Sequence, residues 1–250
     1  MTNINKYFIA NLKMYGNKKY VKSIKKVIDF KKKKKYTKAK VIYCPPYTLL
    51  SDFVNFTKKS SIDVGAQNCH QNEFSGSHTG SISSNMIKSL GAKYIIIGHS
   101  ENRISGEDNS IINKKVVSTL NQKLNVIFCI GETLKEKKKN KTKSVLKKQI
   151  IRGLKKVKSI NKIIFAYEPV WCIGTGKIPK IKDIRDQFIF IKKLLMKKYN
   201  SKNPVIVYGG SVEPKNIKSL NQITEIKGFL IGGASRRPNK FIDIIKKSII

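Results

Sequence analysis

The sequence predicts an α/β protein folded as a closed (β/α)8 barrel. Short apolar runs without polar–apolar alternation recur along the chain, which is typical of parallel strands covered on both faces. Lys-rich stretches with apolar residues three and four positions apart lie between these runs and predict amphipathic helices. The length of 250 residues matches the usual size of such a barrel, about 250 residues. No linker or break in composition divides the chain, so one domain is expected over residues 1–250.

The first half of the chain supplies four expected strands, which are Phe8–Asn11, Val41–Cys44, Ile62–Gly65 and Tyr94–Gly98. Helical spacing of apolar residues follows the first and the fourth of them. It is found at Val21, Ile24, Val27 and Ile28, and again at Ile111, Ile112, Val116, Val117 and Leu120. Strand and helix therefore alternate, as in a parallel sheet whose connections are helices.

The second half supplies four more expected strands, which are Val126–Ile130, Ile163–Tyr167, Val205–Tyr208 and Gly228–Ile231. Apolar residues with helical spacing lie between the second and the third of these strands, at Phe188, Ile191, Leu194 and Leu195. Eight strands that alternate with helices in 250 residues fit a closed barrel better than an open sheet.

Polar residues stand at the carboxyl ends of three expected strands. Asn11 and Lys13 end the first, His99 ends the fourth and Glu168 ends the sixth. In a barrel of this kind these ends surround one mouth, where the active site lies. A carboxylate, an imidazole and an ammonium in one mouth suit the abstraction of a proton next to a carbonyl group. Each residue also has a simpler explanation: an exposed lysine, a core histidine, or a glutamate paired with a lysine.

The stretch after Glu168 predicts a mobile lid. Pro169 and Pro179 stiffen its two ends, and Gly174 and Gly176 can bend between them. A carboxylate at a strand end followed by such a loop indicates a base beneath a lid over Val170–Lys177. The alternative is a tight loop with an incidental glutamate.

Three successive loops near the end of the chain are rich in glycine. They are Gly174-Thr175-Gly176, Tyr208-Gly209-Gly210-Ser211 and Gly232-Gly233-Ala234-Ser235. Glycine lets backbone N–H groups approach a phosphate, and the loops after strands seven and eight are the common phosphate site of these barrels. The sequence therefore predicts a small phosphorylated carbonyl compound as substrate.

The chain is strongly basic, with 52 Lys and Arg against 15 Asp and Glu and a net charge of +37. Only five of the basic residues are arginines. Proteins that recognise the phosphates and base edges of nucleic acids favour arginine, because its guanidinium can donate two parallel hydrogen bonds. Lys, Ile and Asn are all specified by A/T-rich codons, so genome composition is the simplest source of the charge. We expect the runs Lys31–Lys35 and Lys137–Lys139 to be solvated helix ends, and no specific nucleic-acid partner.

The four cysteines, Cys44, Cys69, Cys129 and Cys172, form no C-x-x-C pair and indicate reduced thiols of a cytoplasmic protein. Cys69 and His70, with His78 nearby, offer a metal site as an alternative, but their spacing matches no standard ligand pattern. We expect neither a metal nor a cofactor. No apolar stretch approaches the roughly 18 residues of a membrane span, and the N-terminus lacks the pattern of a signal peptide.

Seven motifs together resemble the triosephosphate isomerase family, in that family's order and over nearly the whole chain. They are Asn11–Met14, Gly65–Asn68, Gly98–Glu101, Cys129–Glu132, Tyr167–Lys177, Tyr208–Val212 and Gly232–Ser235. The resemblance implies a TIM barrel, a homodimer, and interconversion of dihydroxyacetone phosphate and glyceraldehyde 3-phosphate through an enediol without cofactor or metal. It also implies a place in glycolysis, gluconeogenesis and the pentose phosphate pathway.

The resemblance assigns roles to matching positions. Glu168 would be the base and His99 a neutral electrophile at the start of a short helix near Ser100. Lys13 and Asn11 would contact the substrate. The residues expected to support the site are Glu101, Cys129 and Tyr208. Backbone groups of Gly174, Ser211, Gly232 and Gly233 would hold the phosphate, and the lid would comprise Val170, Trp171, Cys172, Ile173, Gly174, Thr175, Gly176 and Lys177.

The chain departs from the family pattern at three places. Asn102 stands where the family has the first of two arginines, Ser81 where it has a glutamate, and Arg236-Arg237 replaces a more apolar step beside the phosphate loop. The first two changes remove both partners of a charged pair near the family's dimer interface. Two other functions are the alternatives: a different barrel that handles phosphosugars, which would lack the His-Ser-Glu and Glu-Pro-Val-Trp motifs, and a barrel retained mainly to bind polyanions.

Overall fold

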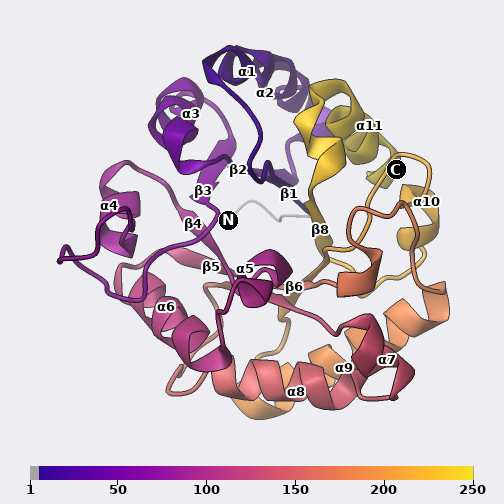
Figure 1. The fold of residues 1–250 in the computed structure, drawn as a ribbon. Coiled ribbons are helices and arrows are strands. Elements are labelled where there is room, and N and C mark those ends of the chain that lie inside the picture. Colours follow the sequence, from indigo (N-terminus) through magenta and orange to yellow (C-terminus); the bar gives the residue numbers. More distant parts are fainter. Residues whose placement is uncertain (1–5, 250) are drawn as a thin grey trace.

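The computed structural model describes residues 6–249, and these form a closed parallel barrel of eight strands with helices around it (Figure 1). The strands follow one another around the barrel in sequence order, and β8 pairs with β1 to close it. They are β1 Lys6–Asn11, β2 Ala39–Cys44, β3 Ile62–Ala66, β4 Tyr94–Ile97, β5 Asn125–Ile130, β6 Ile163–Tyr167, β7 Val205–Tyr208 and β8 Gly228–Ile231. The predicted fold class is confirmed.

Every expected strand is present, and the observed ends of each strand lie within two residues of the expected ends. β1 and β2 each begin two residues before the apolar run, because a neighbouring strand pairs with Lys6 and Ala39. β4 ends one residue early, at Ile97, because Gly98 has a φ of 74° and leaves the extended region. That turn redirects the chain at the strand end that carries His99.

Helices fill the connections between strands. The α-helices are α1 Lys18–Ser23, α2 Lys25–Lys31, α3 Leu50–Thr57, α4 Ser84–Ser89, α5 Ser100–Ile104, α6 Asn109–Asn121, α7 Leu134–Lys138, α8 Thr142–Gly153, α9 Ile181–Tyr199, α10 Ile217–Leu220 and α11 Pro238–Ser248. Short 3-10 turns are η1 Lys34–Tyr36, η2 Tyr47–Leu49, η3 Val170–Cys172 and η4 Gly233–Arg236. The three apolar repeats predicted as helical lie in α1 with α2, in α6 and in α9.

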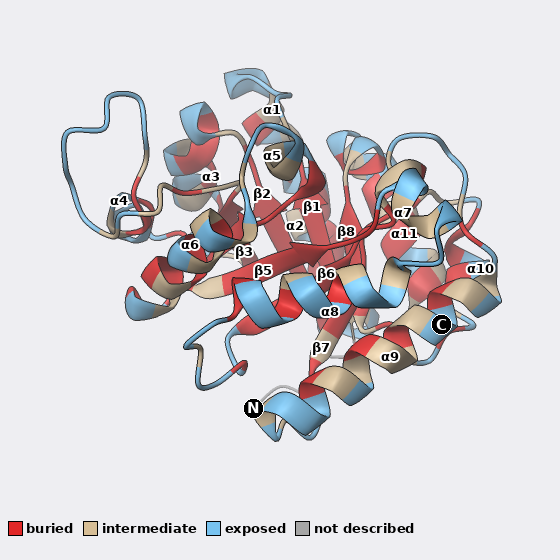
Figure 2. Ribbon diagram, turned by 60° about the horizontal axis from the view of Figure 1, so that its bottom comes forward, coloured by how far each residue is buried: buried red, intermediate tan, exposed pale blue. Residues whose placement is uncertain are grey.

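The strands are buried on both faces, as Figure 2 shows by their colour. Alternate strand residues fill the inside of the barrel, among them Ile9, Ile96 and Ile164. Their neighbours, such as Phe8 and Phe165, pack outward against the helices. Because both sets of side chains are removed from water, the strands read as continuous apolar runs in the sequence.

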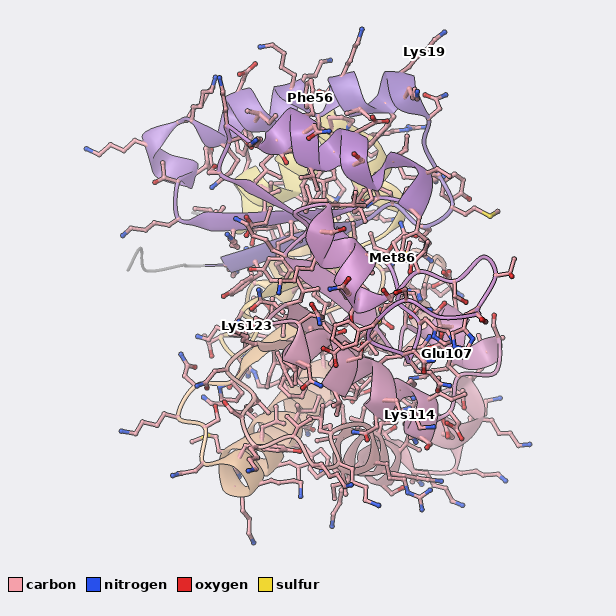
Figure 3. The ribbon with its side chains drawn as sticks, turned by 90° about the vertical axis from the view of Figure 1, so that its left-hand side faces the viewer. Lys19, Phe56, Met86, Glu107, Lys114 and Lys123 are labelled. Atoms are coloured by element: carbon pink, nitrogen blue, oxygen red, sulfur yellow. The ribbon has the colours of Figure 1, made fainter. Side chains whose placement is uncertain are left out.

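Most lysines project outward along the outline of the molecule, as at Lys19 in Figure 3. Lys31 is an exception, and its assignment to a solvated run was wrong. It is 2% exposed, and its ammonium donates hydrogen bonds to the carbonyl oxygens of Tyr36, Thr37 and Ala39. Burial lowers its pKa to about 8, with a smaller effect of Lys40. The lysine thus closes the turn between α2 and β2, a role that its place in a basic run conceals.

A buried ion pair joins α6 to the loop before it. The Lys115 ammonium lies between Glu107 and Asn68, and the side chains of Lys115 and Glu107 are 8% and 15% exposed. Glu107→Ala should lower the free energy of unfolding by about 3 kcal/mol, because it leaves a buried ammonium without its carboxylate. Urea unfolding at one protein concentration measures the loss. The control is Asp243→Ala, which breaks the exposed pair with Lys247 and should cost at most about 0.5 kcal/mol. Equal losses in the two variants would contradict this account.

All four cysteines are unpaired and buried. Among residues 6–249, no three His, Cys, Asp or Glu side chains gather in a way that could hold a metal ion, so Cys69, His70 and His78 do not form the alternative metal site. No helix in that range has the length and apolarity to cross a membrane.

Candidate active site

Glu168 and His99 meet at the mouth of the barrel, from the ends of β6 and β4. Glu168 Oε1 lies 3.4 Å from His99 Nε2, and Glu168 Oε2 accepts a hydrogen bond of 3.4 Å from the Ser100 backbone N–H. The two residues are only 2% and 5% exposed. Two residues 69 positions apart in the chain are therefore in contact and nearly excluded from water.

The tautomer of a neutral His99 ring follows from its backbone neighbours. The residue precedes α5, and the backbone N–H of Glu101 donates to its Nδ1 at 3.3 Å. A ring nitrogen that accepts a hydrogen bond carries no proton, so the neutral ring has its proton on Nε2. That nitrogen faces Glu168 and the cavity. The short helix predicted near Ser100 is confirmed and fixes this arrangement.

Lys13 is held in an unusual backbone conformation beside this pair. Its φ is 52°, in the left-handed region, which costs a non-glycine residue roughly 1–2 kcal/mol. Its N–H donates to Asn11 Oδ1 at 3.0 Å, and its carbonyl accepts from Gln67 Nε2 at 2.9 Å. Its ammonium forms an ion pair with Glu101 Oε1 at 2.5 Å. The surrounding contacts therefore aim the Lys13 side chain across the mouth.

The carboxyl group of Glu168 sits in a tightly packed wall. Burial raises its pKa, and His99, the Ser100 N–H and Lys13 oppose that rise. A Cβ at Gly209 would lie 2.8 Å from Glu168 Cγ, so only glycine fits there. Behind it, Arg103 donates to the carbonyl oxygens of Gly98 and Cys129 and so ties β4 to β5. Gly209 thus leaves space for the carboxylate and Arg103 holds the strand ends beside it, whereas the sequence indicated Gly209 only as part of a phosphate loop and gave Arg103 no role.

A cavity of about 650 Å³ lies in front of these residues. The predicted residues that line it are Asn11, Lys13, His99, Glu168, Ile173, Gly174, Thr175, Gly176, Ser211, Gly232 and Gly233. Of the three supporting residues, Glu101 touches Lys13, whereas Cys129 and Tyr208 lie buried behind the wall. The wall made by the loops after β7 and β8 contains Gly209, Gly210, Gly232 and Gly233 and continues into η4, whose first residue is Gly233. Backbone N–H groups at such a position suit an anion.

The predicted lid begins with η3 and is held at that end by a carboxylate outside the cavity. Glu132 is 1% exposed and accepts hydrogen bonds from Trp171 Nε1 at 3.0 Å and from the Tyr167 hydroxyl at 3.1 Å. Lys137 lies 3.9 Å from the centre of the Trp171 ring and 3.6 Å from Asp183. Lys137 therefore lies at a helix end, as predicted, and is still 34% exposed, but it also contacts Trp171 and Asp183 from distant parts of the chain.

The tip of the lid, residues 174–177, is exposed to solvent. Gly174 and Gly176 both have a φ of 74°, which glycine adopts without strain. Of the other lid residues, Val170, Trp171 and Lys177 do not line the cavity, and Cys172 is completely buried. Nearby, the Tyr208 hydroxyl is buried without a hydrogen-bond partner among the described residues. The segment predicted to be a lid therefore has an N-terminal end anchored by Glu132 and an exposed glycine-rich tip.

A buried carboxylate beside an imidazole and an ammonium, in front of a cavity wall that contains several glycines, is the arrangement expected for isomerising a phosphorylated carbonyl compound. The sequence profile of the family described as "Triosephosphate isomerase" matches residues 6–248. The chain belongs to the triosephosphate isomerase family. This confirms the family that the motifs indicated.

Individual members of the family resemble the chain over its whole length. The triosephosphate isomerase of Dictyoglomus thermophilum is 41% identical over 248 residues, which cover 96% of this chain and 98% of the relative. That of Zygosaccharomyces bailii is 40% identical, with 96% and 97% covered. The crystal structure of the enzyme from Bartonella henselae superposes with a TM-score of 0.89 at 32% identity, covering 98% of this chain and 99% of the other. The chain is thus an aldose–ketose isomerase that interconverts dihydroxyacetone phosphate and D-glyceraldehyde 3-phosphate, a step of glycolysis.

Proposed function

We propose that Glu168 is the base that moves the proton between the two carbons of the triose phosphate. The observation that carries this assignment is its position: a buried carboxylate, 3.4 Å from His99 Nε2, that also lines the cavity. Its raised pKa makes it a stronger base than an exposed glutamate. Hydrogen bonds are often long in a site without substrate, so the 3.4 Å separations are compatible with this role.

The other residues stabilise the charge that the transfer creates. His99 would donate its Nε2 proton to the carbonyl oxygen as an enediol forms, and Lys13 would offset the negative charge there. Asn11 would contact the substrate and fix the backbone of Lys13. The backbone N–H groups of Gly174, Ser211, Gly232 and Gly233 would hold the phosphate, for which the glycine-lined wall gives support.

A coupled assay with glyceraldehyde 3-phosphate tests the activity of the chain itself. We expect rapid formation of dihydroxyacetone phosphate without added metal or cofactor. A purified, folded protein that gives no product above the uncatalysed rate would contradict the assignment. The same assay separates this function from that of another phosphosugar barrel, which would not convert this substrate.

The pKa of Glu168 in the free protein provides an independent check. Burial raises the pKa of the carboxyl group above its ordinary value of 4.5, even though His99 and Lys13 oppose the rise. Titration of its side-chain carbon by ¹³C NMR should therefore show a midpoint above 4.5, with the signal assigned by its absence from Glu168→Gln. A midpoint at or below 4.5 would mean that the neighbouring cations outweigh burial and that the base is weaker than proposed.

We further propose that residues 1–250 work as one catalytic domain, as a homodimer in the cytoplasm. Apolar side chains left exposed near the mouth support a partner: Met14 is 93% exposed, Ile104 77% and Phe74 60%. Phe74 belongs to the connection between β3 and α4, which projects from the barrel in Figure 2. A second copy would cover such side chains. Light scattering coupled to size exclusion should give twice the chain mass of 28.4 kDa.

The charge of the chain predicts only weak binding of nucleic acid. We expect RNA to bind without sequence preference and to be released near 200 mM salt, because scattered lysines contact phosphates alone. Fluorescence anisotropy with two unrelated RNA sequences across salt measures both properties. Tight binding that persists at about 200 mM salt would instead support a polyanion-binding function.

A further inference from the structure

The cavity carries more positive charge than one phosphate accounts for. Besides Lys13, its lining includes the cations Lys215, Arg236, Arg237 and Lys240. The carboxylates in the lining are those of Glu168 and Glu213. Glu213 lies 3.8 Å from Lys240. Within residues 6–249, no carboxylate oxygen comes within 4.0 Å of Lys215, Arg236 or Arg237. These three cations therefore face the cavity side of the loops after β7 and β8 without a carboxylate partner.

Arg236 is held in place, unlike an ordinary surface arginine. Its guanidinium lies 4.1 Å from the centre of the Tyr15 ring, and its Nε donates to the Gly233 carbonyl at 3.3 Å. Stacking and this hydrogen bond restrict the plane of the guanidinium and leave the two terminal nitrogens free to bind an anion. One of them lies 3.9 Å from the position that a Cβ would occupy on Gly233. The free fork therefore lies directly beside the backbone proposed to hold the substrate phosphate.

The two other cations lie close to the same place. Arg237 follows Arg236 and precedes α11. The Lys215 ammonium is 4.0 Å from the position of a Cβ on Gly176, at the lid tip. A cavity of about 650 Å³ is in the middle of the range for ligands of drug size, roughly 300–1,000 Å³. It has room for a ligand larger than a triose phosphate.

We propose that Arg236, with Arg237 and Lys215, forms a second anion subsite beside the phosphate loop, which binds the second phosphate of bisphosphorylated and pyrophosphate compounds. Such compounds then compete with the substrate, because their first phosphate occupies the substrate phosphate site. This inference rests on the proposed function for the position of that first phosphate. The fork geometry explains why an arginine, rather than one more lysine, stands at this position.

Isothermal titration calorimetry with inorganic pyrophosphate and orthophosphate tests the subsite directly, at constant ionic strength and without divalent cations. Wild type should bind pyrophosphate at least about tenfold more tightly than orthophosphate, as expected for one additional charge-assisted contact. Arg236→Leu should reduce that ratio to about threefold or less. Arg236→Lys should give an intermediate ratio, because it keeps the charge and loses the fork. Pyrophosphate should also inhibit isomerisation competitively.

The matched control is Arg152→Leu, which removes an exposed arginine from α8, outside the cavity lining. It should keep the wild-type ratio. A ratio near one in wild type, an unchanged ratio in Arg236→Leu, or an equal loss in Arg152→Leu would each overturn the subsite. Calorimetry needs no turnover, so a protein that binds pyrophosphate with this preference but does not isomerise would contradict the proposed function and leave the subsite standing.

Discussion

Replacing Glu168 with glutamine is expected to lower kcat by at least about 10²–10⁴-fold and to change KM much less. The amide keeps the shape of the side chain in its buried wall, but it cannot accept a proton from carbon. Because the phosphate is held by other loops, substrate binding loses little. Steady-state kinetics in both directions of the reaction measure the two parameters.

Glu225→Gln provides the control, since it makes the same chemical change at a glutamate outside the cavity and should leave both parameters near wild type. A mutant of Glu168 whose KM rises while kcat stays unchanged would show that this residue binds substrate rather than moving the proton.

Removal of the lid tip, Ile173 to Gly176, is expected to cut turnover steeply and to release methylglyoxal and inorganic phosphate. The enediol phosphate is reactive and can expel phosphate in water, whereas a closed lid excludes water from it. The exposed tip makes few packing contacts, so the fold should survive. The hydrogen bond from Trp171 to Glu132 should remain, because it anchors the part of the lid that is kept.

The measurement for the lid is the ratio of phosphate released to isomer formed, compared between the intact and the shortened protein. The comparison requires a shortened protein with the circular dichroism spectrum and oligomeric state of the intact one. The ratio should rise sharply. An unchanged ratio would show that this stretch does not protect the intermediate.

The fold was predictable because strands that are buried on both faces read as continuous apolar runs in the sequence. Runs such as Ile163–Tyr167 are apolar throughout, and Glu168 and His99 follow two such runs at the mouth of the barrel. Glu168 and His99 could therefore be assigned to one site from their places at strand ends. Their separation of 3.4 Å and the tautomer of His99 depend on α5, whose first turn was predicted only through the family resemblance.

Contacts between side chains from distant parts of the chain were not predictable. The roles of Lys31 and Lys137 were missed because a basic run gives no sign of which ammonium is buried among carbonyl oxygens or lies over a ring. Glu132 was visible as part of a motif, but its contact with Trp171, 39 residues away, requires the folded barrel. The sequence indicated Gly209 only as a glycine of the phosphate loop. In the structure, the absence of a side chain at Gly209 also leaves space for Glu168.

The central claim is that Glu168 carries a proton between the two carbons of the substrate. The most direct test runs the reaction from dihydroxyacetone phosphate in D2O and follows the product by NMR. A proton taken up by a carboxylate exchanges with solvent, so deuterium should appear at C2 of the glyceraldehyde 3-phosphate formed, and in Glu168→Gln its incorporation should slow by the same factor as turnover. Isomerisation at the wild-type rate in Glu168→Gln, or deuterium incorporation that this substitution leaves unchanged, would contradict the claim.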